Sequence, residues 1–304
     1  MKMKVVINSQ SQTKGIQHIE ALIRDKFSLF DVDITQTKYP GHAIEITRQA
    51  SSDGFDIIVA VGGDGTINEI INGSIGCNIP IGIIPYGTAN DLSSFLKIPK
   101  DINNACDIII NSNVRSIDLI KVNDWFFITS GGIGLPCDVL AHIKSIKHWR
   151  IAGRQIFSFL GSKIYALVLL MVLLKGKHIG RKLRLQSKKF HYDLEASSLV
   201  IGNQPYLGRD FQVLPGANNN DGVFSVCIIK NEKNRIRFIS TLLRTLTGNH
   251  INSNNVSFFR TNTILLESNN PLDFFGDGEL KLKDTVFRIR LVPGAVKIIA
   301  PSVC

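Results

Sequence analysis

The chain has 304 residues, of which 44% are hydrophobic and 20% are charged. This composition is typical of a packed globular protein with room for two ordinary domains, and it excludes a mainly disordered chain. The net charge of +10 is uneven: twelve Lys and Arg side chains lie within residues 144–189, and without them the chain carries −2. Because residues 140–191 contain no acid, we expect a local basic patch that contacts a polyanionic surface.

The cysteines and histidines give no sign of a disulfide framework or a zinc site. The five cysteines are far apart without a C-x-x-C pair, and the seven histidines show no ligand spacing. The basic N-terminus has too short an apolar run for a signal peptide. We therefore expect a cytoplasmic protein with reduced thiols.

The first third of the chain alternates between strand and helix patterns. Strands that are apolar throughout and alternate with helices predict a doubly wound parallel sheet, covered on both faces. Ligands of such sheets bind at the carboxyl ends of the strands. The expected strands are residues 4–7, 32–35, 57–61 and 81–84, and the expected helices are residues 15–27 and 42–51.

Short β-type segments separated by turn residues follow from about residue 116. This texture predicts a mostly antiparallel β-sandwich, so we expect an α/β domain of residues 1–118 followed by a β-rich domain of residues 119–292. The expected strands of the second domain are residues 119–122, 126–129, 199–202, 223–229, 263–267 and 286–291.

Two helical segments interrupt the second domain, at residues 143–174 and 236–247. Residues 164–174 are all apolar or aromatic, but eleven residues fall short of the length of a membrane span. We therefore expect a core helix or an interfacial helix beside the basic patch ahead of a transmembrane helix. In the later helix one face collects the apolar side chains. These are Ile236, Ile239, Leu242, Leu243 and Leu246.

A glycine-rich loop follows the strand at residues 57–61. Residues 62–69 read Gly-Gly-Asp-Gly-Thr-Ile-Asn-Glu and open a helix. Glycines let the backbone approach a bulky anion, and the amides of a helix N-terminus point at it, so the pattern indicates phosphate binding. It is neither a P-loop nor a dinucleotide fingerprint. The candidate residues are Gly62, Gly63, Asp64, Gly65, Thr66, Asn68 and Glu69.

A second polar loop follows the strand at residues 81–84. Residues 85–91 read Pro-Tyr-Gly-Thr-Ala-Asn-Asp, and two such loops at neighbouring strand ends could line one crevice. Taken alone, this loop is also compatible with an ordinary turn and helix N-cap. The candidate residues are Gly87, Thr88, Asn90 and Asp91.

Together these motifs resemble the catalytic domain of diacylglycerol kinases, including bacterial lipid kinases and the sphingosine and ceramide kinases. The resemblance continues downstream. Its later elements are Gly202-Asn203, Pro215-Gly216-Ala217 with Asp221-Gly222, Gly276-Asp277-Gly278-Glu279 and the closing Pro293-Gly294-Ala295. The first loop alone would be shared with NAD kinases, whereas the combination is specific to lipid kinases.

The resemblance implies a kinase that uses ATP and Mg²⁺. ATP would lie against both glycine loops, with Asn8 and Thr37 nearby, and Asp277 or Glu279 would take the proton of the lipid hydroxyl. It also implies that residues 293–304 return to the first domain. One departure concerns residues 8–12, Asn-Ser-Gln-Ser-Gln, which lack the proline and glycine that the family has there and put that loop's nucleotide contact in doubt.

A metal is implied at the turn of residues 218–223. Asn218, Asp221 and Val223 would provide its oxygen ligands, although the same residues suit a plain hairpin turn. A second Mg²⁺, bridging the ATP phosphates near Asp64, is the one that phosphoryl transfer requires.

We therefore expect a lipid kinase, with diacylglycerol as the leading substrate. The alternatives are a sphingoid base, ceramide or phosphatidylglycerol as substrate, a soluble enzyme of the NAD-kinase type, and a non-catalytic lipid-binding protein. The basic segment at residues 144–189 would hold the enzyme at the inner face of the membrane as a peripheral protein. Nucleic-acid binding is not expected, because no recognition motif accompanies the charge. The sequence leaves open whether the protein forms a homodimer.

Overall fold

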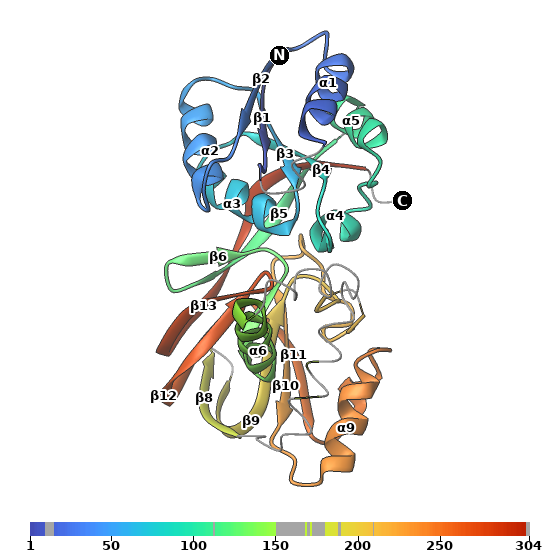
Figure 1. The fold of residues 1–304 in the computed structure, drawn as a ribbon. Coiled ribbons are helices and arrows are strands. Elements are labelled where there is room, and N and C mark those ends of the chain that lie inside the picture. Colours follow the sequence, from blue (N-terminus) through green and yellow to red (C-terminus); the bar gives the residue numbers. More distant parts are fainter. Residues whose placement is uncertain are drawn as a thin grey trace. The chain divides into compact units, whose positions relative to one another are not determined.

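The computed structural model describes residues 1–9, 15–111, 113–149, 168, 171, 180–187, 190–208 and 210–301 (Figure 1). The chain divides into two compact units, one of Met1–Asp118 with Pro293–Cys304 and one of Leu119–Val292. Two strands, β5 (Asn113–Val122) and β13 (Glu279–Ala300), run across these boundaries. The chain thus combines an α/β unit with a β-rich unit.

The first unit is built on a parallel sheet, as predicted. Its strands lie in the order β4-β3-β1-β2, and the end of β13 joins β4 in parallel. All six residues of β3 are buried, which is why this strand reads as an unbroken apolar run. The strands are β1 (Lys2–Ile7), β2 (Asp31–Gln36), β3 (Ile57–Gly62) and β4 (Pro80–Pro85).

Helices flank this sheet on both sides, with α1 near α5 and α2 near α3 (Figure 1). In α1, Ile16, Ile19 and Ile23 are buried, and their spacing places them on one face of the helix. The helices of this unit are α1 (Ile16–Lys26), α2 (His42–Ser52), α3 (Asp64–Ser74), α4 (Asp91–Phe95) and α5 (Ile102–Asn111).

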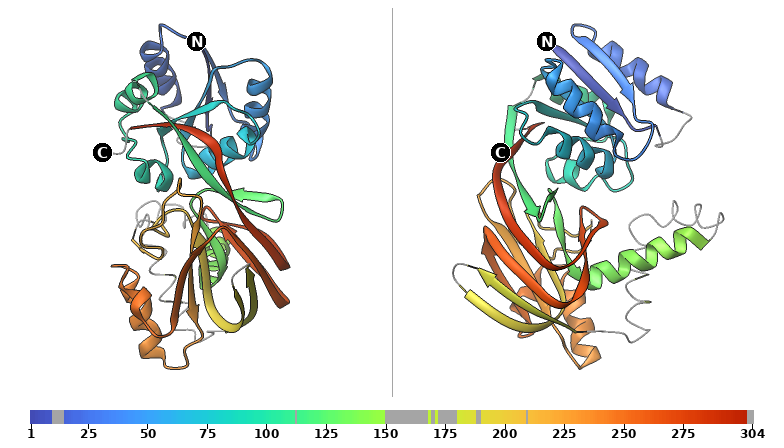
Figure 2. Two further views of the ribbon diagram at one scale, coloured as in Figure 1. Left: turned by 180° about the vertical axis from the view of Figure 1, so that it is seen from behind. Right: turned by 90° about the vertical axis from the view of Figure 1, so that its left-hand side faces the viewer.

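The second unit is an antiparallel network of strands in the order β11-β10-β9-β7-β12-β13. The short strand β8 pairs with both β9 and β12, and β6 pairs with β5. Its strands are β6 (Trp125–Phe127), β7 (Ser130–Gly134), β8 (Arg181–Ser187), β9 (Phe190–Gly202), β10 (Phe224–Lys230), β11 (Val256–Thr261) and β12 (Thr263–Gly276). The other elements are α6 (Leu135–Trp149), α9 (Arg235–Arg244) and the short 3-10 helix η1 (Asn249–Asn252), and Figure 2 shows α6 projecting beyond the strands.

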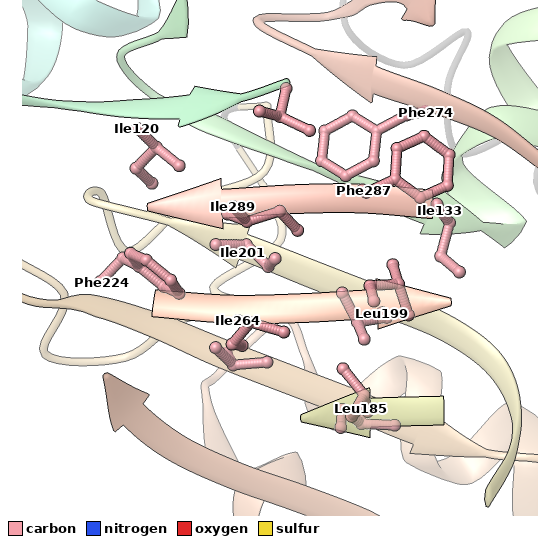
Figure 3. Close-up of a cluster of buried hydrophobic side chains, with 14 of the residues drawn as sticks. Ile120, Ile133, Leu185, Leu199, Ile201, Phe224, Ile264, Phe274, Phe287 and Ile289 are labelled. Carbon is pink, nitrogen blue, oxygen red and sulfur yellow. The ribbon is translucent and has the colours of Figure 1, made fainter. Parts of the chain in front are cut away.

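Successive residues of these strands supply two hydrophobic clusters, one on each face. Leu199 and Ile201 of β9 belong to the cluster drawn in Figure 3, which also contains Phe274 and Phe287. Val200, between them, belongs to the other cluster, which packs under α6 and α9. This alternation is the period of two of a β-strand. Each fully buried large apolar side chain stabilises the unit by roughly 1.5–3 kcal/mol.

One expected strand ends earlier than predicted. Residues 126–129 were expected to be extended, but β6 ends at Phe127. The amides of Ile128 and Thr129 instead donate to the carboxylate of Asp277, so they are not available for a strand ladder.

Three sequence features fall largely outside the described residues. These are residues 10–12 of the loop that follows β1, most of the basic segment 144–189 and the apolar run 164–174. Among the helices that the structure does describe, none combines the length and apolar character that crossing a bilayer requires.

Candidate functional site

The residues predicted to bind nucleotide gather at one edge of the parallel sheet. Ile7, at the end of β1, lies opposite Gln36 of β2 and Val61 of β3, and Gly62 lies opposite Pro85. The four strands therefore end at the same level, and Asn8, Thr37 and both glycine loops follow directly. This is the edge at which open α/β sheets bind ligands.

The two glycine loops touch each other through Gly63 and Gly87. A Cβ atom on Gly87 would lie 2.3 Å from the Cα atom of Gly63, and one on Gly63 would lie 3.1 Å from the Cα atom of Gly87. The amide of Tyr86 also donates to the carbonyl of Gly62 at 2.8 Å. Because no side chain fits between the backbones, glycine at residue 87 is a steric requirement of this contact.

The N-terminus of α3 emerges from this contact. Gly63 precedes the helix and provides no side-chain cap, so the first amides of α3 are the kind of donors that bind an anion. A Cβ atom on Gly65 would meet nothing within 4 Å, so packing does not require glycine there. The Thr66 hydroxyl lies beneath the loop and accepts a 2.9 Å hydrogen bond from Nδ2 of Asn8.

The second loop is shaped by Asn90. This buried residue has a left-handed backbone, with φ of 55°, and its Nδ2 donates to the carbonyl of Gly87 at 2.8 Å. Asp64 reaches towards this loop, with Oδ1 3.5 Å from the amide of Leu92. Thr88 is exposed and Asp91 is half-buried at the start of α4. Asn90 therefore organises the loop.

Two predicted residues of the first loop have structural partners. The carboxylate of Glu69 accepts from the amide of Gly41 at 2.9 Å and from the amide of Ala43 at 3.3 Å, at the start of α2. An acid at a helix N-terminus stabilises the helix, which accounts for Glu69 without a ligand. Asn68 is buried, and its Oδ1 accepts from Nδ2 of Asn72 at 3.2 Å.

Thr37 links the ends of β1 and β2. Its amide donates to the carbonyl of Ile7 at 2.9 Å, and its hydroxyl accepts a long 3.4 Å bond from the amide of Ser9. The threonine is nearly buried. It therefore positions the start of the loop at residues 8–12.

Asp277 lies in the second unit, at the tip of the hairpin that joins β12 to β13. Asp277 and Gly278 both have left-handed backbones, with φ of 47° and 78°, as in the tight turns that favour Asp-Gly. The carboxylate accepts from the amides of Ile128 and Thr129, the latter at 2.8 Å, and from the Thr129 hydroxyl at 2.6 Å. Three donors hold it in one orientation, which distinguishes it from an ordinary exposed turn carboxylate.

Glu279, the other predicted catalytic acid, is exposed. One of its carboxylate oxygens lies 2.5 Å from Nζ of Lys281 on the same strand. A solvent-exposed ion pair of this kind contributes little free energy and fixes orientation weakly. The orientation of the Asp277 carboxylate is therefore fixed more firmly than that of Glu279.

Thr129 and the backbone of Ile128 were not predicted from the sequence as site residues. A signal was present in β7, where Gly131, Gly132 and Gly134 interrupt a short strand. A Cβ atom on Gly132 would lie 2.0 Å from the carbonyl oxygen of Leu199. Glycines in a strand interior mark a close backbone approach, and this one lies next to the residues that hold Asp277.

At the predicted metal turn the structure shows an ion pair. One oxygen of Asp221 contacts the guanidinium of Arg260, and the other accepts from the amide of Val223 at 3.3 Å. Asn218 is exposed. Arg260 occupies one oxygen of this carboxylate and would compete with a cation for its charge. The metal site at residues 218–223 stays a prediction. No group of three or more His, Cys, Asp or Glu side chains is placed to hold a metal elsewhere in the described residues.

Comparison with known protein families matches both parts of the chain. Residues 2–122 match the Diacylglycerol kinase catalytic domain, and residues 155–300 match the YegS C-terminal NAD kinase beta sandwich-like domain. The chain is 28% identical to "Diacylglycerol kinase" of Bacillus subtilis (strain 168), over 91% of this chain and 89% of that protein. It is 27% identical to "Probable lipid kinase YegS" of Escherichia coli O127:H6, over 99% of this chain and 96% of that protein.

Solved structures share the fold. A crystal structure from Bacillus anthracis str. Sterne has a TM-score of 0.80 at 23% identity and covers 98% of this chain and 95% of its own. Another from the same strain, described as a diacylglycerol kinase, has a TM-score of 0.73 at 21% identity and covers 98% of this chain and 96% of its own. The two domain matches together cover most of the chain, and with the named relatives they show that the chain belongs to the diacylglycerol kinase catalytic-domain family of lipid kinases.

Proposed function

We propose that the enzyme transfers the γ-phosphoryl group of ATP to the hydroxyl of diacylglycerol, giving phosphatidic acid and ADP. The relative in Bacillus subtilis carries the name of this activity, and membership of a kinase family implies ATP as the co-substrate. The observation that carries the proposal is the carboxylate of Asp277, which three donors from Ile128 and Thr129 hold in place.

The first unit would bind the nucleotide. The open space at Gly65 would admit phosphate oxygens, and the amides at the start of α3 would donate to them. The carboxylate of Asp64 is a hard oxygen ligand at the same place and fits Mg²⁺ bound to the phosphates. When bound, that ion neutralises phosphate charge during transfer.

The second unit would supply the group that orients the acceptor. In our proposal the lipid hydroxyl donates a hydrogen bond to Asp277 while its oxygen attacks the γ-phosphorus. The new O–P bond forms as the bond to the ADP oxygen breaks, and Asp277 takes the proton. Phosphoryl transfer depends mainly on positioning and charge neutralisation, so a carboxylate fixed by hydrogen bonds suits this role.

Labelled ATP tests the proposal and identifies the lipid. Purified enzyme with Mg²⁺ and γ-labelled ATP is incubated with diacylglycerol, a sphingoid base, ceramide, phosphatidylglycerol or NAD, and the label is measured in the lipids of the organic extract and in the NADP of the aqueous phase. The proposal predicts labelled phosphatidic acid as the main product. If label is transferred mainly to another lipid, that lipid is the preferred substrate in place of diacylglycerol. Label transferred to NAD instead of any lipid would overturn the proposal.

A further inference from the structure

A row of large apolar side chains covers the outward side of α9. Ile236 is 80% exposed, Ile239 41% and Leu243 61%, and Leu246, just beyond the helix, is 47% exposed. Their spacing of three or four residues places them in one line on a helical surface. Apolar residues scattered singly on a surface need no explanation, but a continuous row does.

The opposite side of α9 is anchored in the protein. Phe238 and Leu242 are buried in the cluster that covers one face of β9 and β10. Asn234 caps the helix by accepting from the amides of Ile236 and Arg237 at 3.0 and 3.2 Å, and Thr241 bonds Asn255 at 3.1 Å. The helix therefore cannot turn its outer row inward without losing its own core contacts.

Basic side chains accompany the apolar row. Arg235, Arg237 and Arg244 are exposed, α9 contains no acid, and none of these guanidinium groups forms an ion pair with a described residue. Arginines in the first turn oppose the helix dipole, which favours acids there. The helix thus has charges that do not serve its own stability.

In the described part of the predicted basic segment, two arginines form ion pairs, unlike the arginines of α9. Arg181 forms two bonds to the carboxylate of Asp138, at 2.7 and 2.9 Å, and Arg184 pairs with Asp193 at 3.2 Å. These charges are partly neutralised within the protein. The arginines of α9 are therefore better candidates for contact with an external anion.

We infer that the outer face of α9 docks on an anionic lipid bilayer, with the helix lying in the plane of the interface. An anchored amphipathic helix with an apolar row and flanking arginines matches the chemistry of a bilayer surface, which offers both hydrocarbon and negative charge. A second copy of the chain is a poorer partner, because a two-fold contact through this face would oppose arginine to arginine. The inference rests on the proposed function, whose substrate resides in a membrane.

The segment that follows α9 is connected to the strand ends near Asp277 within the second unit. His250, in η1 just after α9, contacts the carbonyl of Val213 at 3.0 Å, within the segment that joins β9 to β10. That segment begins after Gly202, which pairs with Ser130, and Ser130 accepts the amide of Asp277 at 3.0 Å. A path of chain and hydrogen bonds within the second unit thus links the segment after α9 to the proposed acceptor site.

Vesicle flotation without ATP tests the docking surface. We expect the enzyme to float with phosphatidylcholine vesicles that contain phosphatidylglycerol, and much less with phosphatidylcholine alone. Ile236→Ser combined with Leu243→Ser should weaken this binding at least about tenfold. Arg235→Gln combined with Arg237→Gln should weaken it about tenfold or more on anionic vesicles only, with a smaller effect at high salt.

The matched control is Leu29→Ser combined with Val114→Ser, which removes two exposed apolar side chains from the first unit and should leave flotation unchanged. Activity is measured on vesicles and on a short-chain diacylglycerol dispersed in detergent. The α9 variants should lose activity on vesicles and keep it in detergent. Unchanged flotation of both α9 variants, or a loss of self-association in its place, overturns the inference. Absence of lipid phosphorylation in every format, with flotation as expected, would count against the proposed function alone.

Discussion

The hydroxyl of Thr129 lies 2.6 Å from Oδ1 of Asp277, although the two residues are 148 positions apart in the chain. The threonine also donates its amide to the same oxygen at 2.8 Å. Thr129 therefore provides two of the three donors that orient the proposed acceptor-binding carboxylate, and the amide of Ile128 is the third. Thr129 is a positioning residue in this account, because it acts through Asp277.

Thr129→Val should lower kcat by about tenfold to a hundredfold, because misplacing a reacting group costs rate more than binding. The KM for ATP should change little, since the nucleotide loops lie in the other unit. Thr129→Ser keeps the hydroxyl and should restore most of the rate. Steady-state kinetics on diacylglycerol with a thermal melt of each variant checks this. A valine variant with normal kcat, or with only a raised KM for ATP, would contradict the role.

Two glycine variants distinguish a glycine that packing within the protein requires from a glycine that ATP binding requires. Gly87→Ala drives a methyl group into the backbone of Gly63 and should destabilise the first unit by about 1–3 kcal/mol. Gly65→Ala meets nothing in the protein and should leave stability unchanged or slightly higher. It should still weaken ATP binding, because the methyl group would crowd phosphates at the start of α3. Calorimetric titration with ATP and chemical unfolding distinguish the two effects.

Glu69→Gln should reduce stability by about 1 kcal/mol, because the start of α2 loses a charged acceptor. ATP affinity should stay close to that of the wild-type enzyme. The measurement is urea unfolding together with equilibrium nucleotide binding. A large loss of ATP affinity in a normally stable variant would return Glu69 to the nucleotide site.

His250 should make the second unit sensitive to mild acid. Burial lowers the pKa of this imidazole below its ordinary value of 6.5. The unfolded chain therefore takes up a proton near pH 6.5 that the folded chain resists, and stability falls as pH decreases below that value, by about 1.4 kcal/mol per pH unit at most. His250→Gln should flatten the decline in unfolding free energy between pH 7 and pH 5. An equally steep decline in the variant would exclude His250 as its source.

The sequence predicted the elements whose pattern is local. Strands β3 and β4 are buried almost throughout, so each reads as an apolar run, and the glycine loops follow them directly. Strand β2 has no buried residue, and only its short β-branched stretch indicated a strand. By contrast, β8 was missed because Arg181, Lys182 and Arg184 alternate with two buried leucines, and the charge concealed the period of two. The length of β13 was hidden by Pro293 and Gly294. There the amide of Gly294 donates to Asp118 at 2.8 Å, and the strand continues.

The sequence predicted less of what depends on distant contacts. Asp277 was identified, but its donors come from a bend far away in the chain, which no local spacing reveals. Helical spacing placed Leu242 on one face with Ile236, Ile239 and Leu243, whereas only Leu242 of these is buried. Periodicity gives the width of an apolar face, and the position of Phe238 against the strands decides which part of it meets the core.

The rate of phosphoryl transfer in Asp277→Asn decides whether Asp277 takes the proton of the acceptor hydroxyl. Transfer of label from ATP to diacylglycerol is measured with saturating substrates, beside Glu279→Gln as the matched control, while ATP affinity and thermal stability are recorded for both. The account predicts that Asp277→Asn abolishes labelled phosphatidic acid with ATP affinity retained, and that Glu279→Gln stays active. Full transfer in a folded Asp277→Asn enzyme would contradict it.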